Sequence, residues 1–350
     1  MLNGHNLIIN GDITSGGNAT INSTVNSNIT INKSTSPSGS IGFSSNGNSV
    51  NNFTVNLGQS TGFVMMGSDM KVAGTLHLTN GSIHTGNNNL DLGTTGTITG
   101  SGNSSYVMTG TNGKLSMYVT AGSTNSSTFS VGNQNHYSPA FIQLNSGSSS
   151  GSVSVGIDGD IWSKGTTGTT LSTTKSVVKN TWHVYSDIVS NLNMNLEVKW
   201  SATMEVNGFN RSSSFISHYT GDFWDLSAKA NATAEADGMY SLKRNNINSL
   251  SPFAVFDNAS ENGVNEKVAG NFQIEIYPNP ATNVIDVKNN VPDLSGDFQI
   301  EIINIIGQVI DNQKLSGTET TIFLNNLKEG NYFVRLYNDQ TCIVKKFIKL

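Results

Sequence analysis

Charged side chains are scarce in the first 110 residues, and their types limit the chemistry that this region could perform. The set consists of Asp12, Lys33, Asp69, Lys71 and Asp91. A glycoside hydrolase needs two carboxylates that face each other across the scissile bond. A uronate lyase needs a cationic group, commonly with calcium held by clustered carboxylates. The region has no arginine and no adjacent pair of acidic residues, so neither chemistry is predicted, and Asp69 with Lys71 is interpreted as a surface ion pair.

Residues 111–257 hold more groups that could bind or catalyse. Asp158-Gly159-Asp160 begins like a calcium loop but lacks the downstream acidic ligands, which favours a β-turn. His183 and His218 could act as ligands or bases, but no third ligand is recognisable, and packed or surface histidines are the simpler interpretation. The sequence does not show whether any two of the remaining acidic candidates meet across a sheet. These candidates are Glu197, Glu205, Asp222 and Asp225.

All four tryptophans also lie in this middle region. They are Trp162, Trp182, Trp200 and Trp224. Aromatic rings could form a platform on which a sugar stacks, but a β-sandwich core built from Trp and Phe is the favoured interpretation. The single cysteine, Cys342, cannot form a disulfide within the chain and is interpreted as a small apolar residue of a terminal strand. No cofactor is predicted.

The elements that would position these groups begin with an internal repeat. Pairs of apolar residues separated by one position start at Leu7, Ile29, Phe53 and Leu76, which are 22, 24 and 23 residues apart. A second apolar series, Ile21, Phe43, Met66 and Leu90, follows the first. A fixed period, short strands and corners rich in Gly and Asn predict a β-helix-like solenoid over residues 1–110. An irregular antiparallel sandwich is the alternative.

The outward side chains of this solenoid indicate no familiar binding face. In the first strand series they would be Ile8, Thr30, Thr54 and His77. These are not the regular threonine array of an ice-binding surface. The calcium-binding Gly-Gly-x-Gly-x-Asp repeat is also missing from the sequence. The solenoid is therefore expected to be chemically bare.

Residues 111–257 are predicted to form an antiparallel β-sandwich, because apolar and polar residues alternate in segments such as 153–157 and 192–200. Residues 258–269 are polar and predicted to be a linker. The middle region resembles an uncharacterised module of Bacteroidota surface proteins, which implies no activity. The segments that carry this resemblance are Phe129-Ser130-Val131-Gly132, Tyr137-Ser138-Pro139, Asn180-Thr181-Trp182, Gly208-Phe209-Asn210-Arg211-Ser212, Ser217-His218-Tyr219 and Ser251-Pro252-Phe253-Ala254-Val255.

The last eighty or so residues are predicted to form a small Ig-like β-sandwich over residues 270–350. Phe272, Ile274 and Ile276 alternate with polar residues, as in a half-buried strand. Pro278 and Pro280 then fix φ and remove backbone donors, so the strand must end in a turn. The same alternation returns several times, with glycines between the runs.

Four motifs in this region resemble the type A C-terminal sorting domain of the type IX (Por) secretion system of Bacteroidota. They are Tyr277-Pro278-Asn279-Pro280, Ile305-Ile306-Gly307-Gln308-Val309, Leu327-Lys328-Glu329-Gly330-Asn331-Tyr332-Phe333-Val334-Arg335 and Lys345-Lys346-Phe347-Ile348-Lys349-Leu350. The residues that the resemblance assigns to the sorting signal are Tyr277, Pro278, Asn279, Pro280, Gly307, Gly330, Tyr332, Val334, Lys345, Lys346, Phe347 and Ile348. An Ig-like accessory domain without a transport role is the alternative.

The resemblance implies a destination and partners. The secretion machinery would recognise the folded domain, which would then be removed at the cell surface, and the cargo would be attached to an anionic lipopolysaccharide. The protein would be secreted or held at the outer cell surface. Such cargo normally starts with a signal peptide, and Met1-Leu2-Asn3-Gly4-His5-Asn6 has neither the basic start nor the apolar core of one. The chain is therefore expected to be the C-terminal part, or a mature form, of a longer protein.

Composition agrees with an extracellular all-β protein. Only 12% of the residues are charged, 36 are Gly, and Val, Ile and Thr recur at alternate positions. The net charge of −5 provides no basic field for nucleic acid, and no apolar run approaches the roughly 18 residues of a transmembrane segment. Two functions remain open: a non-catalytic, adhesin-like or structural surface protein, or a carbohydrate-active or carbohydrate-binding protein. The second would bind extracellular glycans in the middle sandwich or in a segment upstream of this chain.

Overall fold

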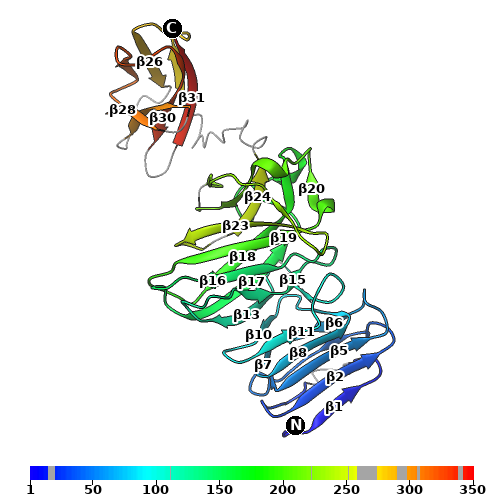
Figure 1. The fold of residues 1–350 in the computed structure, drawn as a ribbon. Helices are drawn as coiled ribbons and strands as arrows, with labels where there is room; N and C mark the ends of the chain where they lie inside the picture. The colour runs from blue at the N-terminus through cyan, green and yellow to red at the C-terminus, as the bar shows by residue number, and fades with distance from the viewer. Residues whose placement is uncertain are drawn as a thin grey trace. The chain divides into compact units, whose positions relative to one another are not determined.

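The computed structural model describes residues 1–14, 20–110, 112–221, 223–250, 252–257, 274–289, 298–305, 308–337 and 342–350. The chain divides into two compact units, Met1–Ser260 and Glu261–Leu350. Strands make up almost all of the regular structure in the described ranges (Figure 1), which confirms the all-β class. The helices there are three short 3-10 turns, namely η1 (Leu171–Thr173), η2 (Ala202–Met204) and η3 (Arg211–Ser213).

The first unit begins with a β-solenoid over residues 6–132, in which the chain passes through three parallel sheets in turn (Figure 1). The first solenoid sheet consists of β1 (Asn6–Ile9), β2 (Asn28–Lys33), β5 (Asn52–Leu57), β8 (Thr75–Asn80) and β11 (Thr97–Thr99). The second consists of β3 (Ser40–Ile41), β6 (Phe63–Met66), β9 (Ser82–His84), β12 (Val107–Met108) and β15 (Val131–Gly132). The third starts with β4 (Ser49–Val50), β7 (Met70–Val72), β10 (Asn89–Asp91) and β13 (Lys114–Val119).

The repeat seen in the sequence is the repeat of this coil. Residues of the first apolar series pair directly in register and stack in the core: Leu7 with Ile29, Ile29 with Phe53, and Phe53 with Leu76. The outward row also follows the prediction, because Ile8, Thr30, Thr54 and His77 lie opposite one another. One coil cannot bury its apolar face alone, so stacking at about 4.8 Å per strand builds the core.

The second apolar series is wrong as a stack. Ile21 does pair with Phe43, but Met66 pairs with Ile41, and Leu90 pairs with Met70. The reason is that each coil has two further faces joined by corners of different length. Residues at a constant spacing from the first face therefore fall on different sheets: Met66 lies on the second sheet and Leu90 on the third.

The third solenoid sheet continues beyond the solenoid. After β13 it adds antiparallel strands, so one sheet changes from parallel to antiparallel pairing between β13 and β17. The added strands are β17 (Gly151–Asp158), β18 (Val177–Ser186), β24 (Pro252–Asp257) and β21 (Ser214–His218), with β20 (Glu205–Val206) paired to β18.

A second antiparallel sheet faces this extension and completes the middle region, as predicted. Its strands are β14 (Ser127–Phe129), β16 (Ala140–Leu144), β19 (Met194–Trp200), β23 (Tyr240–Ile247) and β22 (Thr233–Ala234). Trp182 and Trp200 lie fully buried in the same hydrophobic core as Phe53 of the solenoid. The solenoid and the antiparallel sheets therefore share one core, whereas the boundaries drawn at residues 110 and 257 stay predictions.

The second unit consists of two antiparallel sheets that share a core, in agreement with the predicted sandwich. One sheet holds β25 (Ile274–Tyr277), β26 (Val284–Asn289) and β29 (Glu319–Phe323). The other holds β28 (Val309–Lys314), β27 (Gln299–Asn304), β30 (Gly330–Tyr337) and β31 (Cys342–Lys349). Ile285 and Val287 of the first sheet pack with Ile300, Val334 and Phe347 of the second. Across the described ranges, no helix has the length and apolarity needed to cross a membrane.

Candidate functional site

The turn after β25 is fastened to the last strand of the chain. The Asn279 side chain donates from Nδ2 to the carbonyl of Lys346 at 3.2 Å, and its Oδ1 accepts from the backbone N–H of Ile348 at 3.0 Å. The backbone of Ala281 then donates to the Ile348 carbonyl at 2.8 Å. A side-chain amide carries a donor and an acceptor like a peptide group. Asn279 therefore extends the pairing that Ala281 makes with β31.

Other residues of the predicted sorting signal hold the same region together. The Tyr277 hydroxyl donates to the carboxylate of Glu319 on β29, and this hydrogen bond raises the pKa of Tyr277 to about 12. Tyr332 lies opposite Phe347, and their rings stack with centroids 5.8 Å apart. Pro278 and Pro280 flank Asn279 and shape the turn.

The terminal motif alternates between core and surface. Val334 and Phe347 are fully buried, whereas Lys346 and Ile348 are exposed. Gly330 begins β30 opposite Lys349, and Lys345 lies across from Val334. The described signal residues thus gather on the turn, β30 and β31. Gly307 lies outside the described residues, and the sorting role of each residue stays a prediction.

Sequence reasoning missed a cluster of polar groups beside this motif. Arg335 donates from Nε to Glu301 Oε2 at 2.8 Å and pairs with the same oxygen through its terminal nitrogen. The Tyr337 hydroxyl donates to the other oxygen of Glu301 at 2.9 Å. Glu301 is only 7% exposed, so these donors compensate the burial of its charge. Nothing in the sequence marks Glu301 as the partner, because it lies on a different strand.

Asp158 and Asp160, the two aspartates of the possible calcium loop, make structural contacts. Asp158 accepts from the indole N–H of Trp162 at 2.8 Å, and Asp160 accepts from the Ser172 hydroxyl at 2.5 Å. Lys179 lies 3.6 Å from the other oxygen of Asp160. The two carboxylates therefore hold a turn together. Among the residues described, no three or more His, Cys, Asp or Glu side chains are grouped so that they could hold a metal ion.

The two histidines are packed in the sheet. His183 and His218 are 3% and 5% exposed and lie opposite Pro252 and Phe253 of β24. Burial lowers the pKa of both rings. His218 stacks on Phe253 with centroids 4.6 Å apart, whereas neither ring nitrogen of His183 has a hydrogen-bond partner in the part of the chain described.

Two of the remaining acidic candidates, Glu205 and Asp225, are paired with arginines. Glu205 accepts two hydrogen bonds from Arg211, both at 2.7 Å, and one from the indole of Trp200 at 2.9 Å. Asp225 receives two from Arg244, at 2.7 and 2.6 Å. Glu197 is half-buried on β19, and Asp222 lies outside the described residues. Two of the four acidic side chains are thus held in ion pairs.

Three of the four tryptophans lie in the core. Trp182 and Trp200 are fully buried, and Trp224 is 8% exposed. Trp162 is half-buried and donates to Asp158. The favoured interpretation as core residues therefore holds for three of the rings, which offer no free face on which a sugar could stack.

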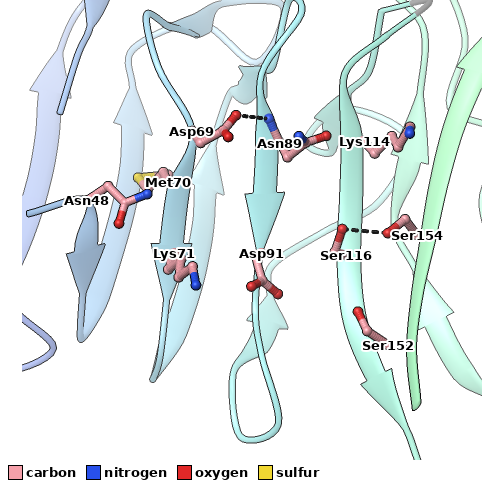
Figure 2. Close-up of a pocket in the computed structure, with 10 residues that line it drawn as sticks. All are labelled: Asn48, Asp69, Met70, Lys71, Asn89, Asp91, Lys114, Ser116, Ser152 and Ser154. Atoms are coloured by element: carbon pink, nitrogen blue, oxygen red, sulfur yellow. Dashed lines mark hydrogen bonds between the residues drawn. The ribbon is translucent and has the colours of Figure 1, made fainter. Parts of the chain in front are cut away.

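A polar groove that the sequence did not indicate lies on the outer face of the third solenoid sheet, where parallel pairing gives way to antiparallel pairing. Figure 2 shows its lining side chains, which come from neighbouring strands. Its volume is about 320 Å³. The lining residues are Asn48, Asp69, Met70, Lys71, Asn89, Asp91, Lys114, Ser116, Ser152 and Ser154.

Strand register aligns four of the lining residues into a row that continues to Tyr185, which lies outside the lining. Lys71 lies opposite Asp91, Asp91 opposite Ser116, Ser116 opposite Ser154, and Ser154 opposite Tyr185. Residues that face each other across paired strands lie on the same side of the sheet. These five side chains therefore cross five successive strands, β7, β10, β13, β17 and β18, on one face.

Several of the charged groups in the groove are held in place by the protein. Asp69 accepts from the backbone N–H of Asn89 at 2.7 Å (Figure 2), and Asp91 accepts from that of Gly93 at 2.8 Å. Lys114 Nζ lies 3.8 Å from the centre of the Tyr185 ring, and burial raises the pKa of Tyr185. The prediction of an ion pair between Asp69 and Lys71 is wrong, because the Asp69 carboxylate accepts from the backbone N–H of Asn89 instead. Lys71 makes no ion pair with any described residue.

The comparison with protein families identifies the second unit. Residues 275–350 match the family model described as a secretion system C-terminal sorting domain (Por_Secre_tail). A comparison with curated proteins finds no match to the chain. The matched range spans β25 to β31 and contains the turn, β30 and β31 described above. Residues 275–350 are therefore a Por C-terminal sorting domain, and the protein is secreted or carried to the cell surface by the type IX secretion system.

Proposed function

We propose that the first unit is the delivered cargo and that it works outside the cell as a non-catalytic, adhesin-like scaffold. The observation that carries this proposal is the state of the acid and base candidates. Glu205 and Asp225 are each held by an arginine, and Asp158 and Asp160 fasten a turn. General acid–base catalysis needs a carboxyl or imidazole that can reach a substrate, and His183 is buried in the sheet.

The shared core supports a scaffold role. One sheet runs from the solenoid into the antiparallel strands, and Phe53 and Trp200 belong to the same apolar cluster. A continuous sheet and core transmit strain across the unit because packed interiors are dense. The first unit can therefore present a surface at a fixed geometry.

We also propose the path by which it is displayed. The type IX secretion machinery recognises the folded second unit, the segment at residues 258–269 is cut, and the cargo is attached to anionic lipopolysaccharide. This segment lies outside the described residues, and its polar sequence without aromatics supports the assignment.

The test uses the full chain with a signal peptide, expressed in a host with a working type IX system. We expect surface-exposed protein, and retention in the periplasm for a matched chain that ends at residue 257. The purified full chain is then incubated with a panel of polysaccharides, and newly released sugar ends are measured. Release of sugar ends would overturn the non-catalytic proposal in favour of a carbohydrate-active enzyme. Surface exposure of the chain that ends at residue 257 would overturn the export path.

A further inference from the structure

We propose that the groove on the third solenoid sheet binds an uncharged, extended oligosaccharide. This inference deepens the proposed function, and rests on it, because it names the ligand class that a surface scaffold would hold. The site lies where β13 passes from parallel pairing with β10 to antiparallel pairing with β17.

The distribution of charge is the first argument. Of the five charged residues in the first 110, Asp12 and Lys33 pair with each other, and the other three line the groove. Lys114 adds a fourth charged group to the lining. Four of the six charged side chains in residues 6–132 therefore line one concave surface. Solubility alone would not require these charged side chains to be grouped in one place.

The kinds of polar group are the second argument. Asp91 and Lys71 lie side by side on paired strands about 4.8 Å apart. A carboxylate accepts and an ammonium group donates, so together they match neighbouring hydroxyls, each of which can do both. The backbone N–H of Gly93 fixes one oxygen of Asp91 at 2.8 Å. The site is therefore partly organised before a ligand arrives, which lowers the entropy cost of binding.

The balance of charge selects the ligand class. The lining carries the two carboxylates Asp69 and Asp91 and the two ammonium groups Lys71 and Lys114. Their formal charges cancel, so the groove provides no net field to attract a polyanion or a polycation. Hydroxyl-bearing Ser116, Ser152 and Ser154 extend the polar surface. An uncharged polyhydroxylated chain satisfies these groups without leaving a charge unpaired.

The shape and the aromatic residues indicate an extended ligand. The row from Lys71 to Tyr185 crosses five strands, a span of roughly 19 Å at the usual strand spacing. Tyr118 lies opposite Ser152, and Tyr118 and Tyr185 are each 40% exposed. The Tyr118 ring, on the same face as the hydroxyls and charges, offers apolar surface to the C–H faces of sugar rings, while Lys114 lies over one face of the Tyr185 ring.

The experiment titrates the purified full chain with neutral oligosaccharides (gluco-, manno-, galacto- and xylo-oligomers) and with acidic ones (oligouronates), using calorimetry. We expect at least one neutral oligomer to bind. We expect Asp91→Ala and Lys71→Ala to weaken that binding about tenfold or more, because each removes a charge-assisted hydrogen bond. Asp12→Asn is the matched control, since this solenoid aspartate lies outside the groove lining and pairs with Lys33. It should bind like the unmodified chain.

Tyr118→Ala keeps the proposal testable if a charge variant folds poorly, because Tyr118 is 40% exposed and belongs to no buried cluster. This variant should also weaken binding. Unchanged affinity in well-folded groove variants would place the ligand elsewhere and overturn the site. Binding only to oligouronates, with strong salt dependence, would overturn the uncharged class. If nothing binds, the glycan site fails while the scaffold proposal stands. Newly released sugar ends would overturn the scaffold proposal instead.

Discussion

His183 illustrates how burial changes the meaning of a residue. In the sequence it could be a ligand or a base, but it lies 3% exposed in the middle of β18 with both ring nitrogens unpartnered among the described residues. Loss of hydration disfavours the charged imidazolium, so the pKa of His183 is lowered; the charge of Asp158 opposes this shift and that of Lys114 reinforces it. The neutral His183 ring therefore contributes to packing in the interior.

This setting predicts a pH dependence of stability. The unfolded chain binds the proton with a pKa near 6.5, above that of folded His183, so the unfolded state takes up more protons as pH falls. The free energy of unfolding should therefore decrease below about pH 6.5 and level off once the pH passes the folded pKa. His183→Leu should reduce this decrease, measured by urea unfolding at pH 7.5 and 5.0. His77→Asn, on the outer face of the solenoid, is the control, and an equal decrease in all three proteins would contradict the account.

At the scale of elements, side-chain amides extend the strand pairing in both units. On the first solenoid sheet, Asn28 donates to Asn6 at 2.8 Å and accepts from Asn52 at 3.0 Å, so an amide ladder runs beside the backbone ladder. In the sorting domain, Asn279 does the same for β31 by pairing with the backbone of Lys346 and Ile348. In each case an asparagine joins segments that are distant in the sequence.

Asn279→Ala should therefore destabilise the sorting domain by about 1 kcal/mol, the usual net value of hydrogen bonds that are partly open to solvent. Its unfolding midpoint in the full chain, followed by calorimetry, should fall. Asn312→Ala is the matched control, because this exposed asparagine lies on β28 and its backbone N–H, rather than its side chain, donates to the Asp311 carboxylate. Equal midpoints for the two variants would show that the Asn279 pairing contributes nothing measurable.

At the scale of the whole molecule, the main core of each unit is a separate cluster of apolar residues. Phe53, Trp182 and Trp200 belong to one cluster, whereas Val334 and Phe347 belong to another. Because the solenoid and the antiparallel sheets share the first cluster, the first unit should unfold as one cooperative body. The sorting domain has its own core.

Calorimetry of the full chain should accordingly resolve two transitions. Phe53 is fully buried, and Phe53→Ala should cost about 3–5 kcal/mol through lost burial and the cavity left behind. It should lower only the transition of the first unit. Val334→Ala, in the second core, should lower only the other. A shift of both transitions by either variant would show that the units are energetically coupled.

The sequence by itself determined those features that are encoded locally. Alternation of apolar and polar residues gave the strands, the spacing of Leu7, Ile29 and Phe53 gave the first face of the solenoid, and the ordered motifs from Tyr277 onward gave the sorting domain. These patterns are visible because a strand and its turn are built from residues that are close in the chain.

Only the tertiary structure decided which side chains meet. Asn279 finds its partners 67 and 69 residues away, and Lys71 lies opposite Asp91 only through the register of two paired strands. The second apolar series failed for the same reason, since corners of unequal length shift the register between faces. Neighbours across a sheet depend on lateral pairing, which a one-residue slip would change completely. The sorting domain could thus be identified from the sequence, while the groove could not.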